Sequence, residues 1–311
     1  MKKKRVLVTG EDGLVGYAIK SISKEYSNLE FSFINRKCAN LTKENDVENV
    51  FANKRPDYVV NCAARVGGIK RNLEQPVEQF EQNILMNTHV VRNCHKYNVE
   101  KLITFSSICV LPPDQLPLKE DNIHHSAPYY GHWFYAHAKR MLDVQIEAYR
   151  KQYNRNYCSL LPGSLFGSND NYNLDSGHVI PSLIHKCFLA KKNNVAFSVW
   201  GDGSAYREFL YSIDLARITL ELLNNVDVLP QNLLVSSDVE YSIKQVVDKV
   251  CEFFDYNNVS WETDKPNGQL HRTSDLRNLR TILPDFSFTS FDESLKKSID
   301  WFIEHYPNCR I

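Results

Sequence analysis

The chain has 311 residues, of which 43% are hydrophobic and 24% charged, as expected for a globular protein of one large domain or two closely packed lobes. Lysine plus arginine and aspartate plus glutamate both number 37, so no overall charge favours nucleic acid or a membrane surface. No apolar run approaches the ~20 residues of a membrane span, and the apolar stretch after the basic start is too short for a signal peptide. We therefore expect a cytoplasmic protein with no nucleic-acid or membrane partner.

The first half of the chain alternates short apolar runs with amphipathic stretches, a pattern typical of parallel strands joined by crossover helices. It predicts strands at residues 5–9, 30–34, 58–62, 101–106 and 157–161, and helices at 14–27, 42–53, 77–97 and 135–153. The expected fold is an α/β doubly wound parallel sheet of the Rossmann type, with ligands beyond the carboxyl ends of the strands.

Beyond Pro162 this rhythm gives way to a long polar loop, GSLFGSNDNYNLDSGH, and such loops in compact enzymes usually carry function. Later helices are predicted at 242–254 and 291–306. We expect a smaller C-terminal α/β lobe that binds substrate and covers the ligand edge of the sheet. The predicted division is 1–165 for the cofactor-binding domain, with 212–234 returning to it, and 166–211 plus 235–311 for the substrate-binding lobe.

Three glycines follow the first strand and open the first helix in TGEDGLVG. Glycines there let the backbone approach a pyrophosphate, while the free N–H groups and dipole of the helix favour its negative charge. A simple tight turn is the alternative, but the strand–turn–helix context makes it the weaker reading. The residues predicted to bind a dinucleotide here are Gly10, Gly13, Leu14, Val15 and Gly16.

Arg36 and Lys37 stand at the end of the second strand, where NAD enzymes usually place a carboxylate on the ribose 2′-hydroxyl. A carboxylate would repel a 2′-phosphate, whereas a guanidinium can bind it with paired hydrogen bonds. We therefore expect NADP(H) as the cofactor, the alternative being two solvated charges on a loop. Two further segments are expected to flank the adenine and the pyrophosphate, Asn40-Leu41 and Ala63-Ala64.

Tyr135 and Lys139 are four residues apart in YAHAK, so a helix places both on one face. A tyrosine with a pKa of ~10 needs its phenolate stabilised to act near neutrality, and an ammonium one turn away can do this and also bind the nicotinamide ribose. Ser107, at the end of the preceding strand, can hydrogen-bond the substrate oxygen that Tyr135 protonates. The glycine turn, the serine and Tyr-x-x-x-Lys, in that order, resemble the short-chain dehydrogenase/reductase superfamily.

A closer resemblance runs along nearly the whole chain. The segments AARVGGI, SSICVLP, YAHAKRMLDVQ, GHVIPSLIHK, VWGDGSAYREFLY and LPDFSFT resemble the GDP-L-fucose synthase family. The resemblance implies an extended short-chain reductase that uses NADPH on GDP-4-keto-6-deoxy-mannose and also epimerises carbons 3 and 5. It further implies a homodimer that pairs through the predicted helices 77–97 and 135–153.

The same resemblance assigns roles to individual residues. Ser107, Tyr135 and Lys139 would form the reductive centre, and Cys109 and His178 the epimerisation pair. Removing the hydrogen on carbon 3 or 5 gives an enolate at the keto oxygen, so Cys109 would act as base and His178 as the acid on the opposite face. A packed thiol and a structural histidine are the alternatives. His178 is also expected beside the cofactor, and the substrate-binding residues implied are Asn83, Ser107, Lys186, Trp200, Arg207 and Arg272.

Two departures from the family pattern keep an alternative open. Gly163-Ser164 replaces a Thr-Asn pair beside the sugar, and Glu11-Asp12 stands in the glycine turn where some relatives have basic groups. A 4-reductase without epimerase activity, acting on a related GDP-4-keto sugar such as a 6-deoxy-heptose, is therefore the second hypothesis.

Other functions fit the residues less well. A nucleotide-sugar 4,6-dehydratase needs an acid–base pair beside the serine, and residues 108–110 supply no carboxylate. A 4-epimerase that recycles NAD would not need Cys109 and His178, and a non-catalytic NADP-binding protein would be expected to lose Tyr135 or Lys139. The eight cysteines lack zinc-ligand spacing, so we expect reduced thiols and no metal.

Overall fold

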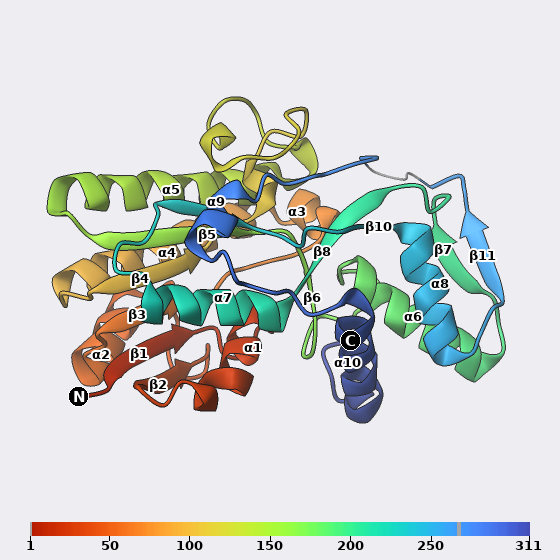
Figure 1. Cartoon of the computed structure of the whole chain (residues 1–311), viewed down its shortest axis with the longest axis horizontal. Coiled ribbons are helices and arrows are strands. Elements are labelled where there is room, and N and C mark those ends of the chain that lie inside the picture. The colour runs from red at the N-terminus through yellow and green to blue at the C-terminus, as the bar shows by residue number, and fades with distance from the viewer. Residues whose placement is uncertain (1, 266–268) are drawn as a thin grey trace.

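Short runs of valine, isoleucine and leucine form a six-stranded sheet in the first lobe (Figure 1). In the computed structural model, which describes residues 2–265 and 269–311, the strand order is β2-β1-β3-β4-β5-β9. All neighbouring strands are parallel. The strands are β1 Lys4–Thr9, β2 Leu29–Ile34, β3 Tyr58–Asn61, β4 Lys101–Phe105, β5 Asn156–Pro162 and β9 Asn232–Val235. The predicted doubly wound fold is confirmed.

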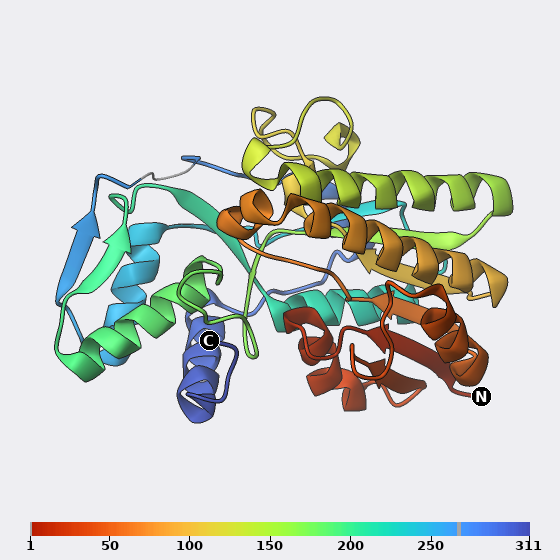
Figure 2. The ribbon, with the colours of Figure 1, turned by 180° about the vertical axis from the view of Figure 1, so that it is seen from behind.

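Both faces of this sheet are buried, which explains why its strands are apolar at consecutive positions. Val6 and Val8 pack against one set of helices, α1 (Leu14–Ile22) and α7 (Ser212–Asn225). Leu7 faces the opposite set, α2 (Glu44–Lys54), α4 (Pro76–Lys96) and α5 (Trp133–Tyr153). Figure 2 shows α4 and α5 side by side across the sheet. Each fully buried valine or leucine contributes about 1.5–3 kcal/mol.

The predicted elements agree with the observed ones to within one or two residues at each end, with one larger difference. The helix predicted to reach residue 27 ends at Ile22, and a 3₁₀ turn, η1 (Ser23–Glu25), follows. The hydroxyls of Ser21 and Ser23 donate to the carbonyls of Ala18 and Lys20, at 2.7 and 2.8 Å. Such hydroxyls compete with backbone N–H groups for helix carbonyls and favour helix ends.

The second lobe has its own core, formed by aromatic and aliphatic side chains beneath a small mixed sheet. This sheet has the order β10-β8-β6, and β7 pairs with β11 in a separate ribbon. Their bounds are β6 Ser164–Phe166, β7 Phe197–Trp200, β8 Tyr206–Tyr211, β10 Glu240–Ser242 and β11 Val259–Glu262. The helices of this lobe are α6 Val179–Asn193, α8 Ile243–Phe254 and α10 Phe291–His305, while η3 Glu120–Asn122 and α9 Arg277–Ile282 lie against β9 of the first sheet.

Helix α6 was not predicted. Its apolar residues recur at 179–180, 183–184 and 187–190, which is helical spacing, and Pro181 lies in its first turn. A proline in the first turn of a helix is tolerated, because the N–H that it lacks has no partner within the helix. Within the described ranges, no helix is both long and apolar enough to cross a membrane.

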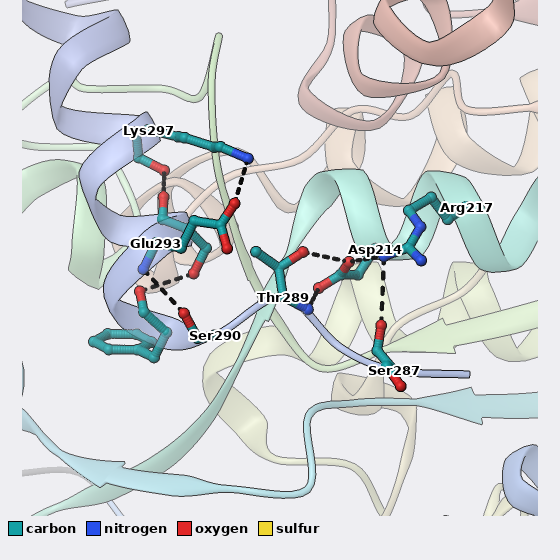
Figure 3. A network of polar contacts seen from close by, with 10 residues as sticks. Asp214, Arg217, Ser287, Thr289, Ser290, Glu293 and Lys297 are labelled. Atoms are coloured by element: carbon teal, nitrogen blue, oxygen red, sulfur yellow. Dashed lines mark hydrogen bonds and ion pairs between the residues drawn. The ribbon is translucent and has the colours of Figure 1, made fainter. Parts of the chain in front are cut away.

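A buried carboxylate ties the two lobes together (Figure 3). Asp214, in α7, accepts hydrogen bonds from the backbone N–H and the hydroxyl of Thr289, both at 2.8 Å. Arg217 pairs with the same carboxylate at 3.1 Å. Since Thr289 precedes Ser290, the N-cap of α10, this network fixes the approach of that helix to the first lobe.

Candidate active site

The glycine turn brings the backbone of β1 close to that of the segment after β3. Gly10 has a left-handed φ of 69°, and a Cβ there would lie 2.9 Å from the backbone nitrogen of Ala63. A Cβ on Gly16 would lie 2.2 Å from the carbonyl oxygen of Gly10. Gly13 caps α1, so Leu14 and Val15 form its first turn, where N–H groups lack helical partners. This is a cradle that only glycine can form, and it suits a pyrophosphate.

Next to the turn lies a cleft of about 610 Å³. The predicted cofactor residues that line it are Gly10, Gly13, Arg36, Asn40, Leu41, Ala63 and Ala64. Lys37 is exposed beside Arg36 but does not line the cleft, and its backbone N–H donates to the side-chain oxygen of Asn35 at 3.0 Å. Arg36 is therefore the better placed of the two basic residues for a phosphate in the cleft.

Three arginines that sequence reasoning missed also line the cleft: Arg65, Arg71 and Arg310. Arg310 comes from the C-terminal end of the chain, where its guanidinium donates to the carbonyl of Asn169. The buried Nε of Arg65 has no hydrogen-bond partner among the described residues. With Arg36 these cations suit the phosphates of NADP, although Asp12 also lines the cleft. The nearby charge of Glu11 is neutralised by Lys20 at 2.8 Å.

Ser107, Tyr135 and Lys139 come together beyond β4. Ser107 precedes a 3₁₀ turn, η2 (Ile108–Val110), and its hydroxyl oxygen accepts the backbone N–H of Cys109 at 3.2 Å. Tyr135 lies in the first turn of α5, buried, and the Lys139 ammonium is 5.8 Å from its ring centroid. That ammonium donates to the carbonyl of Phe105 at 2.7 Å.

Burial shifts the titration of both members of this pair. The Lys139 side chain, only 2% exposed, has its pKa lowered by burial to about 8. Burial, with a smaller contribution from the charge of Cys109, raises the pKa of the Tyr135 phenol above its usual value. The phenol is therefore protonated at neutral pH and suited to give a proton to a developing alkoxide.

His132, a residue that sequence reasoning did not select, lies close enough to Cys109 to influence the ionisation of its thiol. Burial opposes ionisation of this thiol, but His132, Arg272 and Ser107 together outweigh it and lower the pKa of Cys109 to about 6. His132 lies in η4 (Tyr130–His132), just before α5. Its position three residues before Tyr135 places it on the same side of the helix start, a spacing that could have revealed it.

His178 lies on a different element and is exposed. It occupies the N-cap position of α6, where its charge acts on Asp170. Burial raises the pKa of the Asp170 carboxyl, and His178 partly opposes that rise. No contact joins His178 to Cys109 among the described residues, so its predicted role as partner acid stays a prediction.

Two arginines of the second lobe lie near each other, and one of them reaches the catalytic turn. Arg272 donates to the carbonyl of Ile108 at 3.3 Å, and its buried Nε has no hydrogen-bond partner among the described residues. Burial lowers the pKa of Arg207, in β8, and the charge of Arg272 lowers it further. Two neighbouring guanidinium groups of this kind form a site for an anion such as a diphosphate.

The other residues predicted to bind substrate differ in their surroundings. The Lys186 ammonium lies 5.5 Å from the ring centroid of Trp200, whose side chain is 61% exposed at the end of β7. Asn83 is buried in α4, where its amide oxygen accepts the N–H of Arg65 and its amide nitrogen donates to the carbonyl of the same residue, both at 3.0 Å. Through these two hydrogen bonds, Asn83 holds the loop that follows β3 against α4.

Comparisons with known proteins identify the family to which this chain belongs. The NAD dependent epimerase/dehydratase family matches residues 6–235. A GDP-L-fucose synthase from Dictyostelium discoideum is 37% identical over 99% of this chain and 98% of its own length. The chain belongs to the GDP-L-fucose synthase branch of that family. A GDP-L-fucose synthetase from Naegleria fowleri, solved bound to NADP, is 32% identical with a TM-score of 0.94, covering 100% of this chain and 96% of that one. The fold is shared by a GDP-6-OMe-4-keto-L-xylo-heptose reductase from C. jejuni. The two chains are 20% identical, with a TM-score of 0.88 over 98% of this chain and 99% of that one.

Gly163, which stands where the family pattern has a threonine, is closely packed against its neighbours. Gly163 extends the pairing of β5 with β9 by donating its N–H to the carbonyl of Val235 at 2.8 Å. A Cβ on Gly163 would lie 2.4 Å from the hydroxyl oxygen of Ser236. Any larger residue would therefore have to displace Ser236.

Within the described ranges, no three histidine, cysteine, aspartate or glutamate side chains gather as a metal site.

Proposed function

We propose that this protein catalyses the NADPH-dependent reduction of a GDP-linked 4-keto-6-deoxy sugar and epimerises carbons 3 and 5 of the sugar. The observation that carries the proposal is the position of Cys109, which is hydrogen-bonded to Ser107 through its backbone N–H and lies near Tyr135 and His132. Reduction alone needs the hydroxyls, the lysine and the cofactor. A thiol that ionises near neutrality at the same place supplies the base that epimerisation needs.

The reductive step follows from the groups beyond β4. Arg36 and the glycine turn would hold NADPH, which when bound would supply the hydride for the keto carbon. Ser107 donates a hydrogen bond to the keto oxygen, and Tyr135 transfers its phenolic proton to that oxygen as negative charge develops there. The Lys139 ammonium keeps the local potential positive and favours this transfer.

Epimerisation uses the same oxygen-binding groups. The Cys109 thiolate removes the proton from carbon 3 or 5, and the electron pair of the broken C–H bond moves to the keto oxygen. Ser107 and Tyr135 hydrogen-bond the resulting enolate. Protonation from the opposite face, which we assign to His178, inverts the carbon.

Substrate binding is assigned to the second lobe. The Arg207–Arg272 pair suits the GDP diphosphate, since two guanidinium groups can each form paired hydrogen bonds with phosphate oxygens. Trp200 and Lys186 lie at the rim of that lobe and are assigned to the rest of the substrate. We propose that residues 1–165 and 212–234 form the cofactor-binding domain. Residues 166–211 and 235–311 form the substrate-binding lobe.

We also propose a cytoplasmic homodimer that pairs through α4 and α5. Apolar side chains are exposed along both helices: Val77, Phe80 and Leu85 on α4, and Met141 and Val144 on α5. Exposed apolar patches of this kind are typical of protein–protein interfaces. Light scattering that gave the 36.0 kDa of a single chain at micromolar concentration would contradict the dimer.

The deciding experiment is incubation with NADPH and GDP-4-keto-6-deoxy-mannose in deuterated water, followed by proton NMR of the product. Reduction with deuterium at carbons 3 and 5 supports the bifunctional enzyme. NADPH consumption without deuterium at those carbons identifies a 4-reductase, the second hypothesis, and a GDP-4-keto-6-deoxy-heptose should then be tried as substrate. Absence of NADPH consumption with both sugars contradicts the proposal.

A further inference from the structure

We propose that Arg310, which follows α10 in the second lobe, binds a phosphate group of NADP(H) at the glycine turn of the first lobe. The assignment rests on the cofactor-binding part of the proposed function and is independent of epimerisation. It gives the second lobe a direct part in holding the cofactor.

The segment after α10 is tied to the loop that follows β6. The backbone N–H of Tyr172 donates to the carbonyl of Arg310 at 2.7 Å. The guanidinium of Arg310 donates to the carbonyl of Asn169 in the same loop. The side-chain amide of Asn169 in turn donates to the carbonyl of Asp12, inside the glycine turn, at 3.1 Å. Two hydrogen bonds through one asparagine therefore connect Arg310 to the backbone of the cofactor cradle.

Helix α10 itself packs beside α1, whose first turn forms part of that cradle. The indole N–H of Trp301, in α10, donates to the hydroxyl of Tyr17, in α1, at 3.1 Å. The Trp301 ring also stacks on that of Tyr172, with 6.0 Å between the centroids and 18° between the planes. Tyr172 is fully buried and is the residue whose N–H bonds Arg310. The packing that joins the two lobes therefore also sets where Arg310 lies.

The charges along the cleft give Arg310 a function there. Four arginines line the cleft, Arg36, Arg65, Arg71 and Arg310, against the single carboxylate of Asp12. The first three belong to the first lobe, so Arg310 is the one cation that the second lobe supplies among the described lining residues. A carboxylate in the glycine turn would repel a pyrophosphate held there, and a guanidinium bound to the adjacent loop offsets that charge.

The guanidinium of Arg310 retains donors for a ligand. Arg310 is exposed, and only its Nη2 has a hydrogen-bond partner among the described residues, the carbonyl of Asn169. The N–H groups on Nε and Nη1 suit the paired hydrogen bonds that phosphate oxygens accept. The geometry favours the pyrophosphate over the 2′-phosphate, because the glycine turn to which Arg310 is tied is the pyrophosphate cradle.

The test measures cofactor binding without turnover. Fluorescence titration in the absence of sugar gives the Kd for NADPH and for NADH with wild type, Arg310→Gln and Arg310→Lys. We expect Arg310→Gln to raise the Kd for both coenzymes by about tenfold, the lower end for a lost charge-assisted hydrogen bond, since Arg310 is exposed. Arg310→Lys should recover much of the affinity, because it keeps the charge. Arg277, an exposed arginine of α9 that does not line the cleft, supplies the matched control, and Arg277→Gln should bind both coenzymes like wild type.

The two coenzymes distinguish the two kinds of phosphate. A rise in Kd for both supports binding of the pyrophosphate, which they share. A rise for NADPH alone supports binding of the 2′-phosphate, which NADH lacks.

Two results would overturn the assignment of Arg310. One is an Arg310→Gln variant whose Kd values equal those of wild type. The other is an equal rise in Arg310→Gln and Arg310→Lys together with a lower urea midpoint of unfolding, because the substitutions would then act through the fold. Failure of wild type to bind NADPH would contradict the proposed function itself. NADPH-dependent turnover by wild type with unchanged binding in Arg310→Gln contradicts only the role of Arg310.

Discussion

The ammonium of Lys139 donates a hydrogen bond to the carbonyl oxygen of Phe105, 2.7 Å away. The same ammonium lies 5.8 Å from the ring centroid of Tyr135. Phe105 is the last residue of β4, two positions before Ser107. This bond therefore anchors α5 to the strand that positions the serine. Lys139 is therefore a buried cation bound to a carbonyl and not to a carboxylate. Burial lowers the pKa of its ammonium to about 8.

The first prediction is that reduction falls as pH rises through about 8, because Lys139 is charged below its pKa and neutral above it. A Lys139→Arg variant that remains active should lose this decline, since a guanidinium stays charged throughout. The measurement is kcat/KM against pH with a ready-epimerised ketone. An identical decline in the arginine variant would assign it to another group.

Tyr135→Phe should lower ketone reduction by about 10²–10⁴-fold, because the proton donor is lost while the ring remains. NADPH binding, measured by fluorescence titration, should be nearly unchanged, since the proposed cofactor contacts are mainly those of the glycine turn and Arg36. Substantial residual turnover would mean that another acid, such as His178, delivers the proton.

Arg36→Glu should shift preference from NADPH toward NADH. Loss of a charge-assisted hydrogen bond costs about 1.5–3 kcal/mol, or about 10- to 150-fold in kcat/KM with NADPH. Lys37→Glu is the matched control and should change the preference less, because Lys37 does not line the cleft. Equal effects of the two substitutions would contradict this assignment.

Cys109→Ser should stop deuterium from entering the sugar, because a serine hydroxyl is far too weak a base at neutral pH. Reduction of a ready-epimerised ketone should continue, since Ser107, Tyr135 and Lys139 remain. Proton NMR for exchange and NADPH absorbance for reduction measure the two steps separately. Full exchange in the variant would make the thiol structural.

Asp214→Ala should destabilise the fold by about 2–4 kcal/mol, because the partly buried N–H and hydroxyl of Thr289 lose their acceptor. Lys297→Ala, which removes an exposed ion pair with Glu293 in the same region (Figure 3), is the control and should cost less than about 1 kcal/mol. Urea unfolding measures both. Equal losses would mean that the network around Asp214 contributes little to joining the lobes.

Much of the fold was predictable because its signals are local. The strands of the first lobe are short apolar runs, and the glycine turn and the spacing of Tyr135 and Lys139 each lie within one or two turns of chain. Periodicity of this kind depends only on helix and strand geometry. The second lobe was less predictable, since a proline lies in the first turn of α6 and the strands of this lobe have only three to six residues each.

The sheet and the glycine turn could thus be predicted from the sequence alone, and the reductive centre proposed from it, with the family resemblance adding Cys109. Only the tertiary structure decided which groups surround that thiol. His132, Cys109 and Arg272 meet from three separate segments, and Arg310 reaches the cofactor cleft from the far end of the chain. Contacts between distant segments leave no local pattern, because they are fixed by how the helices and the two lobes pack on the sheet rather than by spacing along the chain.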